Sequence, residues 1–480
     1  MQTAKAYIGG RWVAAAHPDQ VLDVVDPSTG LVIGSIPKGS PDDVDAAAAA
    51  AGAAQPAWER LGAGERATLV KEAARRVRAA SQELAAMQSA EGGKPLGDSE
   101  GGVLAGAGAL EQYGELGPLH RGRSLQGGWG ATDAMVHVPY GVAALLVPWN
   151  DPLAITGGLL GAALAAGNTV VLKPSEKTPL SSARLVELFD HLPPGVINLV
   201  LGDGAAGAAL VEHPLVDLVV HVGSVRTGRA IAERCAALGK KAVLELGGKD
   251  PLIVDEGVDP AWAASQAALG AFANCGQICT SVERIYVHRS VAEAFLTELV
   301  REAERRVVGP PTDEATTMGP LVDEAQRAKV DSHVQDAVAS GATVLTGGRP
   351  APGPGFFYPP TVLTDVGDDM VVFQEETFGP VAAVRVVDSF EEALVAANGT
   401  EFGLAATVLT TSQEHAQQAM RELRVGTVKI NAVFGGAPGG AASPHKASGQ
   451  GFGYGPELLD EVTRTRVVHY GLPGRGPAPG

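Results

Sequence analysis

The sequence predicts an α/β protein whose core is a doubly wound parallel sheet. From Val138 to Asp255, short runs rich in Val, Leu and Ile alternate with helical segments. The runs show no polar alternation, which is typical of strands buried on both faces, and regular strand–helix alternation is typical of parallel sheets. At ~150 residues per unit, the 480 residues suggest about three structural units.

Composition excludes several classes of protein. Hydrophobic residues make up 45% and charged residues 19%, an ordinary globular balance. The formal charge of −17 disfavours nucleic acid and anionic lipid surfaces as partners. The most apolar stretch, 142–167, is interrupted by Pro148, Asn150, Asp151 and Pro152, so we expect no membrane span.

The cysteines and the N-terminal residues indicate the compartment. Three cysteines are too few for a disulfide scaffold and fit a reducing environment. The opening MQTAKAYIGGRW lacks the apolar core of a secretory signal. We therefore expect a cytoplasmic protein.

The N-terminal elements follow from turn and capping residues. Residues 21–37 predict two short strands around a turn at Asp26–Gly30. Ser40-Pro41-Asp42-Asp43 combines a capping hydroxyl, a proline at the first helical position and acidic residues, and therefore opens a helix. A second helix is predicted from about Gly64 to Ala90, with charged residues on one face.

The central and C-terminal elements follow from the alternation itself. The helices predicted between the central strands are Leu153–Gly167, Ser181–His191, Ala205–Glu212 and Thr227–Leu238. A second α/β unit starts near Asp250, with helices at Pro260–Phe272, Val291–Val307 and Leu321–Gly341 and strands at ERIYVH and ATVLTGG. A third set of strands and helices follows from Val381 to Asn431. Segments 347–360 and 435–456 are rich in Gly and Pro and predict loops, and the last ten residues predict a disordered tail.

Cys279 is the candidate nucleophile. It follows Gly-Gln in FANCGQICTSVER, where a predicted helix ends. A thiolate attacks carbonyl carbon strongly when a lowered pKa or a nearby base supports it. Most free cysteines are instead small buried apolar residues, which we expect of Cys235. Cys275 is expected to be a bystander, with a disulfide to Cys279 as the alternative.

Two further side chains follow apolar strands at positions that packing explains poorly. Glu245, in VLELGGKD, is placed where burial can raise a carboxyl pKa toward that of a general base, and the two glycines after it allow close backbone approach. The alternative is an ion pair with Lys249 or Lys241. Asn150, in VPWNDP, can donate its amide to an oxyanion, and the alternative is a turn-forming residue.

A nucleotide crevice is indicated by residues after two other strands. Lys173 and Glu176, in VVLKPSE, stand where open α/β sheets bind nucleotides. Lysine can donate to ribose hydroxyls, whereas glutamate can accept from a 2′-hydroxyl and would repel a 2′-phosphate. Gly223-Ser224 and Gly228 open a helix, which suits a pyrophosphate, and a plain capped helix start is the alternative.

Taken together, these strings resemble those of the NAD(P)-dependent aldehyde dehydrogenase superfamily over nearly the whole chain. The matching strings are PWN at 148–150, GNTVVLKPSE at 167–176, GS at 223–224, ELGGKDP at 245–251, GQICTSVER at 276–284, EETFGPV at 375–381, FGLAATV at 402–408 and IN at 430–431.

The resemblance implies a fold and its division. It implies an aldehyde dehydrogenase-like α/β fold, with a Rossmann-like cofactor domain formed by 1–118 and 139–248. Residues 249–427 would form the catalytic domain that carries Cys279. Residues 119–138 and 428–480 would supply a small oligomerisation sheet and the tail, and a homodimer or homotetramer is expected.

The resemblance also implies roles for residues. Cys279 would attack the aldehyde, Asn150 and the Cys279 backbone N–H would hold the oxyanion, and Glu245 would activate water to hydrolyse the thioester. The residues expected at NAD, or alternatively NADP, are Pro148, Trp149, Lys173, Ser175, Glu176, Gly223, Ser224, Glu376 and Phe378. The substrate pocket is expected to include Asp151, Ala154, Gly158, Ile278, Thr280, Phe434 and Ala442. No metal is expected.

The chain departs from the family pattern near the substrate. The residue after PWN, which is often aromatic in the family, is Asp151 in this chain. Many members carry a proton-relay lysine where this chain has Leu159, and a bulky aromatic residue where it has Gly158. Lys446, Ser448 and Gly449 keep the C-terminal register, but the usual Arg-Glu pair is Phe452-Gly453. We expect a wide pocket for a bulky apolar or aromatic aldehyde, disfavouring anionic substrates, and slow deacylation.

Two other functions compete with an aldehyde dehydrogenase that uses water. A CoA-acylating aldehyde dehydrogenase shares the fold, but such enzymes generally lack the general-base glutamate, which Glu245 supplies. A non-catalytic binding protein on the same scaffold is the second alternative, which the altered C-terminal motif permits. Glu176 favours NAD over NADP, although Lys177 beside it could offset that preference.

Overall fold

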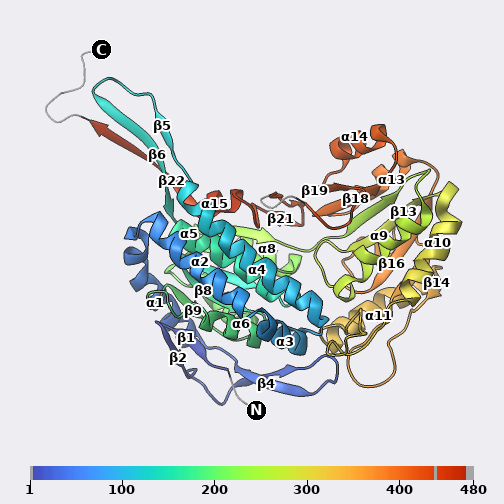
Figure 1. The fold of residues 1–480 in the computed structure, drawn as a ribbon, viewed down its shortest axis with the longest axis horizontal. Coiled ribbons are helices and arrows are strands. Elements are labelled where there is room, and N and C mark those ends of the chain that lie inside the picture. Colours follow the sequence, from blue (N-terminus) through green and yellow to red (C-terminus); the bar gives the residue numbers. More distant parts are fainter. Residues whose placement is uncertain (1–3, 437–439, 472–480) are drawn as a thin grey trace.

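The computed structural model describes residues 4–436 and 440–471 of the chain. Two lobes and a projecting arm make up the molecule (Figure 1). Apart from Gly471, the predicted C-terminal tail lies outside the described residues.

The first lobe is built on an eight-stranded sheet ordered β2-β1-β9-β8-β7-β10-β11-β21. Its five central strands, β9 to β11 in this order, pair in parallel, as predicted. The strands are β1 (Ala6–Ile8), β2 (Arg11–Val13), β7 (Val142–Val147), β8 (Thr169–Pro174), β9 (Ile197–Leu199), β10 (Val216–Val222), β11 (Lys241–Glu245) and β21 (Gly449–Gln450).

Alternate residues of β7 reach two different cores, which explains the unbroken apolar pattern. Ala143, Leu145 and Val147 belong to one buried cluster. Val142 and Leu146 belong to another, so both faces of the sheet are covered. The helices of this lobe are α1 (Pro41–Arg60), α2 (Ala63–Ala79), α3 (Ser81–Gly92), α4 (Leu96–Leu116), α5 (Pro152–Ala166), α6 (Pro179–Glu187), α7 (Gly204–Glu212) and α8 (Val225–Leu238).

Local signals near the N-terminus were read correctly, except for one helix. β3 (Val21–Val25) and β4 (Val32–Pro37) form the predicted hairpin. Ser40 caps α1 in a reciprocal capping box with Asp43. The helix predicted over 64–90 is wrong as a single element, because the backbone leaves helical geometry at Ala80, which separates α2 from α3.

The second lobe is one seven-stranded sheet ordered β14-β15-β16-β13-β12-β18-β19. The sequence suggested separate second and third sets, but β12 pairs with β18, so they form a single sheet. Its strands are β12 (Asp250–Val254), β13 (Val282–His288), β14 (Thr343–Thr346), β15 (Thr361–Thr364), β16 (Val381–Val387), β18 (Ala405–Leu409) and β19 (Thr427–Ile430). Its helices are α9 (Pro260–Phe272), α10 (Arg289–Glu304), α11 (Glu324–Ala339), α12 (Val371–Gln374), α13 (Phe390–Ala397) and α14 (Gln413–Glu422).

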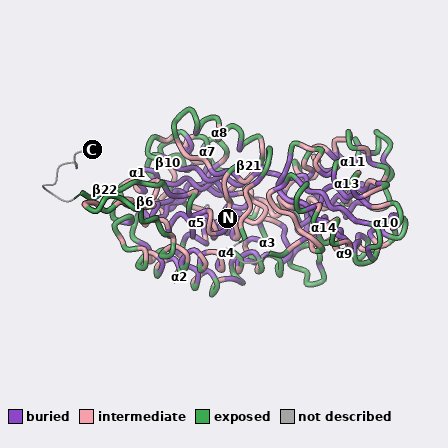
Figure 2. The backbone as a smooth tube through the Cα atoms, turned by 90° about the horizontal axis from the view of Figure 1, so that it is seen from above, coloured by how far each residue is buried: buried purple, intermediate pink, exposed green. Residues whose placement is uncertain are grey.

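The arm is a three-stranded sheet of β5 (Arg123–Leu125), β6 (Ala131–Pro139) and β22 (Thr463–Gly471). Figure 2 shows it as an exposed projection beyond the buried sheets of the two lobes. Less of the segment 428–480 belongs to the arm than predicted, because β19 joins the second sheet and β21 joins the first. β17 (Phe402–Gly403) and β20 (His445–Lys446) pair with each other, and α15 (Glu457–Glu461) leads into β22.

Within the described parts of the chain, helices that combine the length and apolarity of a membrane span are absent.

Candidate active site

Cys279 lies on a tightly held loop between the 3-10 helix η2 (Ala273–Gly276) and β13. Asn274, Cys275 and Gly276 all have positive φ, and a Cβ at Gly276 would overlap the Gly379 carbonyl, so that position requires glycine. The buried Gln277 side chain donates to the Asn274 carbonyl (3.0 Å) and accepts from the Val322 N–H (2.9 Å). The loop is therefore preorganised around the thiol.

Asn150 is bound to this loop. Its Nδ2 donates to the Gln277 carbonyl at 3.0 Å, and its own carbonyl accepts from Asn274 Nδ2 at 3.1 Å. The amide therefore comes from the end of β7 to within two residues of Cys279. This position fits a donor to an oxyanion formed next to the sulfur.

The Cys279 thiol is surrounded by carboxyl groups. Burial raises its pKa well above the ordinary range, and Glu245, Asp250 and Glu376 raise it further, while a hydrogen bond with the Thr280 backbone lowers it. The thiol is therefore protonated at neutral pH when no ligand is bound. The Cys279 thiol therefore lacks the lowered pKa that could activate it, and a base must take its proton instead.

Glu245 is free of the ion pairs considered as its alternative. Lys241 pairs with Glu461 and Lys249 pairs with Glu283. Burial raises the pKa of Glu245 to about 7, which suits a general base near neutral pH. The carboxylate faces Gly453, where a Cβ would overlap its Oε2.

The two glycines after Glu245 admit other chain segments, as the sequence suggested. A Cβ at Gly247 would overlap the Glu376 carboxylate, and one at Gly248 would lie 2.6 Å from the Cys279 carbonyl. The Gly248 N–H donates to Glu376 Oε1 at 3.1 Å. Burial, reinforced by Glu283, raises the pKa of Glu376 to about 7.

Glu283, in GQICTSVER, connects its own motif with ELGGKDP and EETFGPV. Its carboxylate accepts from the Lys249 ammonium, from the Thr377 N–H (2.7 Å) and from the Phe378 N–H (2.8 Å). Phe378, at φ +56°, packs edge-on against Trp149 with ring centroids 5.4 Å apart. The ion pair thus fixes the turn that carries Glu376 and Phe378.

A cavity of about 780 Å³ opens at the carboxyl ends of β7, β8 and β10. Pro148, Trp149, Lys173, Ser175, Glu176, Gly223 and Ser224 all line it, so seven of the nine predicted cofactor residues share one crevice. Lys173 Nζ lies 3.6 Å from Glu176 Oε2. Ser224 lines the crevice and also caps α8 by accepting from the Thr227 N–H (3.3 Å).

Lys177 offers less charge to a 2′-phosphate than its position suggests. Its ammonium pairs with Asp323 at 2.7 Å and stands 5.1 Å from the centre of the Trp149 ring. Glu176 carries a partly exposed side chain at the same cavity.

The expected substrate residues lie on separate segments. Ile278 and Thr280 flank Cys279 and are half-buried like it, and Phe434, Ala154 and Ala442 are also half-buried. At Gly158 an added Cβ would meet only Ala109, at 4.0 Å, so the position leaves space. Leu159 is buried in the core.

The partners of Asp151 correct the expectation that its charge repels anionic substrates. Its carboxylate pairs with Lys94 at 3.1 Å and accepts from Gln88 Nε2 at 3.2 Å. Like-charge repulsion of an anionic substrate cannot therefore be assigned to Asp151 alone, because Lys94 offsets its charge.

The other cysteines are structural. Cys235 and Cys275 are each 1% exposed and belong to apolar cores, as expected, and the three cysteines are all free thiols.

Three site residues were missed by sequence reasoning. Tyr454 follows Gly453; burial raises its pKa and so do Glu245 and Cys279, while a hydrogen bond with Thr427 lowers it. Lys429 donates to the Val433 carbonyl (2.7 Å), and burial lowers its pKa while Asp250 and Cys279 raise it. His221 lines the same crevice as the predicted cofactor residues. None of the three lies in the strings that carry the resemblance. Their proximity to the site appears only when segments distant in the sequence pack together.

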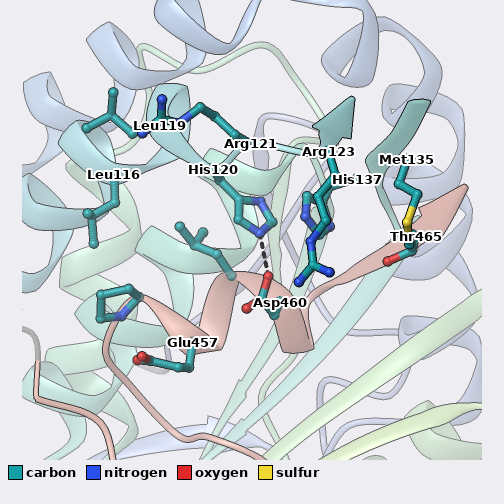
Figure 3. A pocket seen from close by; sticks show the side chains of 13 residues that line it. Leu116, Leu119, His120, Arg121, Arg123, Met135, His137, Glu457, Asp460 and Thr465 are labelled. Atoms are coloured by element: carbon teal, nitrogen blue, oxygen red, sulfur yellow. Dashed lines mark hydrogen bonds and ion pairs between the residues drawn. The ribbon is translucent and has the colours of Figure 1, made fainter. Parts of the chain in front are cut away.

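A metal-ligand set also occurs at the base of the arm. Among the described residues, His120, His137 and Asp460 bring ligand atoms within 4.8 Å of one another. His120 Nε2 lies 2.8 Å from Asp460 Oδ1, and the two imidazoles stack at 23° (Figure 3). Nearly parallel rings direct their lone pairs side by side rather than to one point, and Arg121 and Arg123 line the same cavity, so this geometry favours a hydrogen-bonded His120–Asp460 pair over a metal centre.

Known proteins match this arrangement throughout. The sequence profile described as "Aldehyde dehydrogenase family" matches residues 12–468. A betaine aldehyde dehydrogenase of Cereibacter sphaeroides is 37% identical over 462 residues, covering 94% of each chain.

Solved structures agree with the sequence matches. An NAD-dependent aldehyde dehydrogenase from Sinorhizobium meliloti is 37% identical, with a TM-score of 0.96 over 99% of this chain and 96% of that one. An aldehyde dehydrogenase from Bacillus cereus, solved as its NAD+ complex, is 35% identical, with a TM-score of 0.95 over 98% and 97% of the two chains. The fold and the relatives are those of oxidoreductases that oxidise aldehydes with NAD(P). The chain belongs to the aldehyde dehydrogenase family.

Proposed function

We propose that the chain oxidises an aldehyde to a carboxylic acid in two steps, with water as the final acceptor of the acyl group. The observation that carries the proposal is that the Glu245 carboxyl group acts electrostatically on the Cys279 thiol and has a pKa of about 7, which lets it take a proton at neutral pH. Because the thiol is protonated in the free protein, its proton must pass to a base before it attacks.

The first step forms a carbon–sulfur bond. Glu245 accepts the thiol proton and the sulfur adds to the aldehyde carbon, which leaves a negative oxygen. The Asn150 amide and the Cys279 N–H would donate to that oxygen. When bound, the dinucleotide would supply the hydride acceptor that lets the thiohemiacetal become a thioester.

The second step releases the acid. Glu245 first releases the thiol proton to solvent and then takes a proton from water, the water oxygen bonds to the acyl carbon and the carbon–sulfur bond breaks. The sulfur leaves as thiolate and regains a proton from Glu245. A CoA-acylating reaction would not need this carboxylate, so Glu245 supports hydrolysis.

The crevice residues would hold the dinucleotide. We place the adenosine ribose at Lys173 and Glu176, the pyrophosphate at Gly223 and Ser224, and the nicotinamide end at Glu376 and Phe378. We propose a preference for NAD over NADP, since the partly exposed Glu176 carboxylate can accept from a 2′-hydroxyl and would repel a 2′-phosphate, while Asp323 neutralises Lys177.

For the substrate we propose a neutral aldehyde with a bulky apolar or aromatic group. Gly158 leaves space, and Glu245, Asp250 and Glu376 around the thiol disfavour an anion. The betaine aldehyde named for the relative is cationic, which makes it the main competing substrate in the test. We also propose a homodimer or homotetramer joined through the arm, and a cytoplasmic location that suits three free thiols.

The test follows NADH absorbance with NAD, NADP or NAD plus CoA. The aldehyde panel contains benzaldehyde, long-chain aldehydes, terpenoid aldehydes, betaine aldehyde and succinate semialdehyde. Cys279→Ala is the control. Turnover without CoA that disappears in the variant supports the mechanism. A first rank for betaine aldehyde or succinate semialdehyde would overturn the substrate proposal, and a requirement for CoA would overturn hydrolysis.

A further inference from the structure

His221 carries a buried imidazole whose ring nitrogens lack partners. The residue is 8% exposed, near the end of β10, and lines the cofactor crevice. Within the described residues, neither Nδ1 nor Nε2 makes a hydrogen bond of good geometry, although the Leu146 backbone lies close enough to act on the ring. Buried polar atoms are rarely left this way, because an unmade hydrogen bond is costly. The ring is therefore a candidate contact for a bound molecule.

The strand register places His221 in a row with Lys173. Leu146 of β7 pairs with Lys173 of β8 on one side and with His221 of β10 on the other. Residues in register across parallel strands direct their side chains to the same face of a sheet. All three line the cavity, so they form its floor, with Lys173 at one end and His221 at the other.

The imidazole lies against the turn that begins α8. A Cβ at Gly223 would stand 2.7 Å from Nε2 and Cε1 of His221. Ser224 follows as the N-cap of this 14-residue helix, whose first N–H groups and dipole favour an anion. Burial lowers the pKa of His221 to about 4; the Leu146 backbone raises the pKa and Lys173 lowers it, and the ring is neutral and carries one N–H.

We propose that His221 is a cofactor-binding residue that donates its N–H to the pyrophosphate of the dinucleotide. This rests on the proposed place of the cofactor in the crevice. The apolar side chains of Val211 and Ile231, which line other walls, suit the adenine ring and leave the α8 turn to the phosphates. The cofactor thereby meets a donor from the sheet as well as donors from the helix.

Calorimetric titration with NAD, ADP and adenosine tests the assignment. His221→Phe removes the donor and keeps a ring, whereas His221→Gln keeps a donor. A hydrogen bond to a charged acceptor predicts that His221→Phe weakens NAD and ADP about tenfold or more. Adenosine, which has no phosphate, should bind both proteins equally, and His221→Gln should recover most of the affinity.

Lys173→Met separates two ways of failing. If it weakens NAD while His221→Phe does not, the crevice is the cofactor site and the role of His221 is wrong. If neither variant weakens NAD, the placement of the cofactor itself is wrong. Equal losses for ADP and adenosine in His221→Phe would overturn the pyrophosphate contact, because a displaced cavity floor would then explain the loss.

Discussion

The carboxylate of Glu245 lies directly against the backbone of Gly453, so closely that a Cβ at Gly453 would overlap Glu245 Oε2. β21, a few residues earlier, pairs with β11, with Gly449 opposite Glu245. The C-terminal segment therefore forms one wall of the proposed base, at the point where the sequence departs from the family pattern.

Gly453→Ala should slow both proton transfers that are assigned to Glu245. The added methyl group must push the Glu245 carboxylate aside, and a displacement of about 1 Å can cost up to a hundredfold in rate. Stopped-flow traces should show a slower first burst of NADH, and steady turnover should fall about 10–100-fold. Gly108→Ala is the matched control, since a Cβ there meets nothing within 4 Å; an unchanged steady rate in Gly453→Ala would count against Glu245 as the base.

The pH dependence of turnover should follow Glu245. Its pKa is raised to about 7, so the carboxylate is protonated below that value and cannot accept a proton from water. We expect kcat to rise with pH through about 7 and then to level off. Glu245→Gln should remove this rise and lower kcat by about 10²–10⁴-fold. A profile centred on the same pH in the variant would assign the titration to another group.

Tyr454 should assist deacylation, because its phenol is coupled to both Glu245 and Cys279. Tyr454→Phe keeps the ring and removes the hydroxyl, so loss of one donor predicts about a three- to tenfold decrease in steady turnover. Aldehyde KM and the NADH burst should stay near those of the parent. If KM rises instead and kcat is unchanged, Tyr454 shapes the substrate pocket and takes no part in proton transfer.

Lys94→Met should make the enzyme discriminate more strongly against anionic aldehydes. The change leaves Asp151 without the ammonium that lies 3.1 Å from its carboxylate. We expect KM for succinate semialdehyde to rise several-fold while KM for benzaldehyde stays constant. Asp151→Asn should act in the opposite direction, and parallel shifts for both substrates would show that the pair serves only to hold the loop between α3 and α4 against the start of α5.

Sequence reasoning succeeded where the signal is local. The chain order of Glu245, its two glycines and Cys279 could be read from short strings, and so could the capping of α1 by Ser40. It failed where the outcome depends on pairing between distant segments. Periodicity does not show that β19 joins β18, that Lys94 neutralises Asp151, or that Gly453 meets Glu245. His221 was missed for the same reason, since the strand register and not the motif places it beside Lys173.

The buried pair of Lys249 and Glu283 should be needed for stability and for cofactor affinity together. Lys249 is 1% exposed and Glu283 is 3% exposed, so Lys249→Met would leave a carboxylate buried without its cation. Breaking such a pair typically costs about 3–5 kcal/mol of the free energy of unfolding.

Lys249→Met should also weaken NAD. Glu283 holds the Thr377 and Phe378 N–H groups, and a protonated or displaced carboxyl would release the turn that carries Glu376. Urea denaturation and NAD titration of the same preparation measure the two effects. A matched surface variant, Arg289→Met, removes an exposed ion pair with Asp388 and should change stability by less than about 1 kcal/mol. If Lys249→Met lost stability but bound NAD normally, the ion pair would support the fold alone, and the turn with Glu376 would be held by the Gly248 N–H instead.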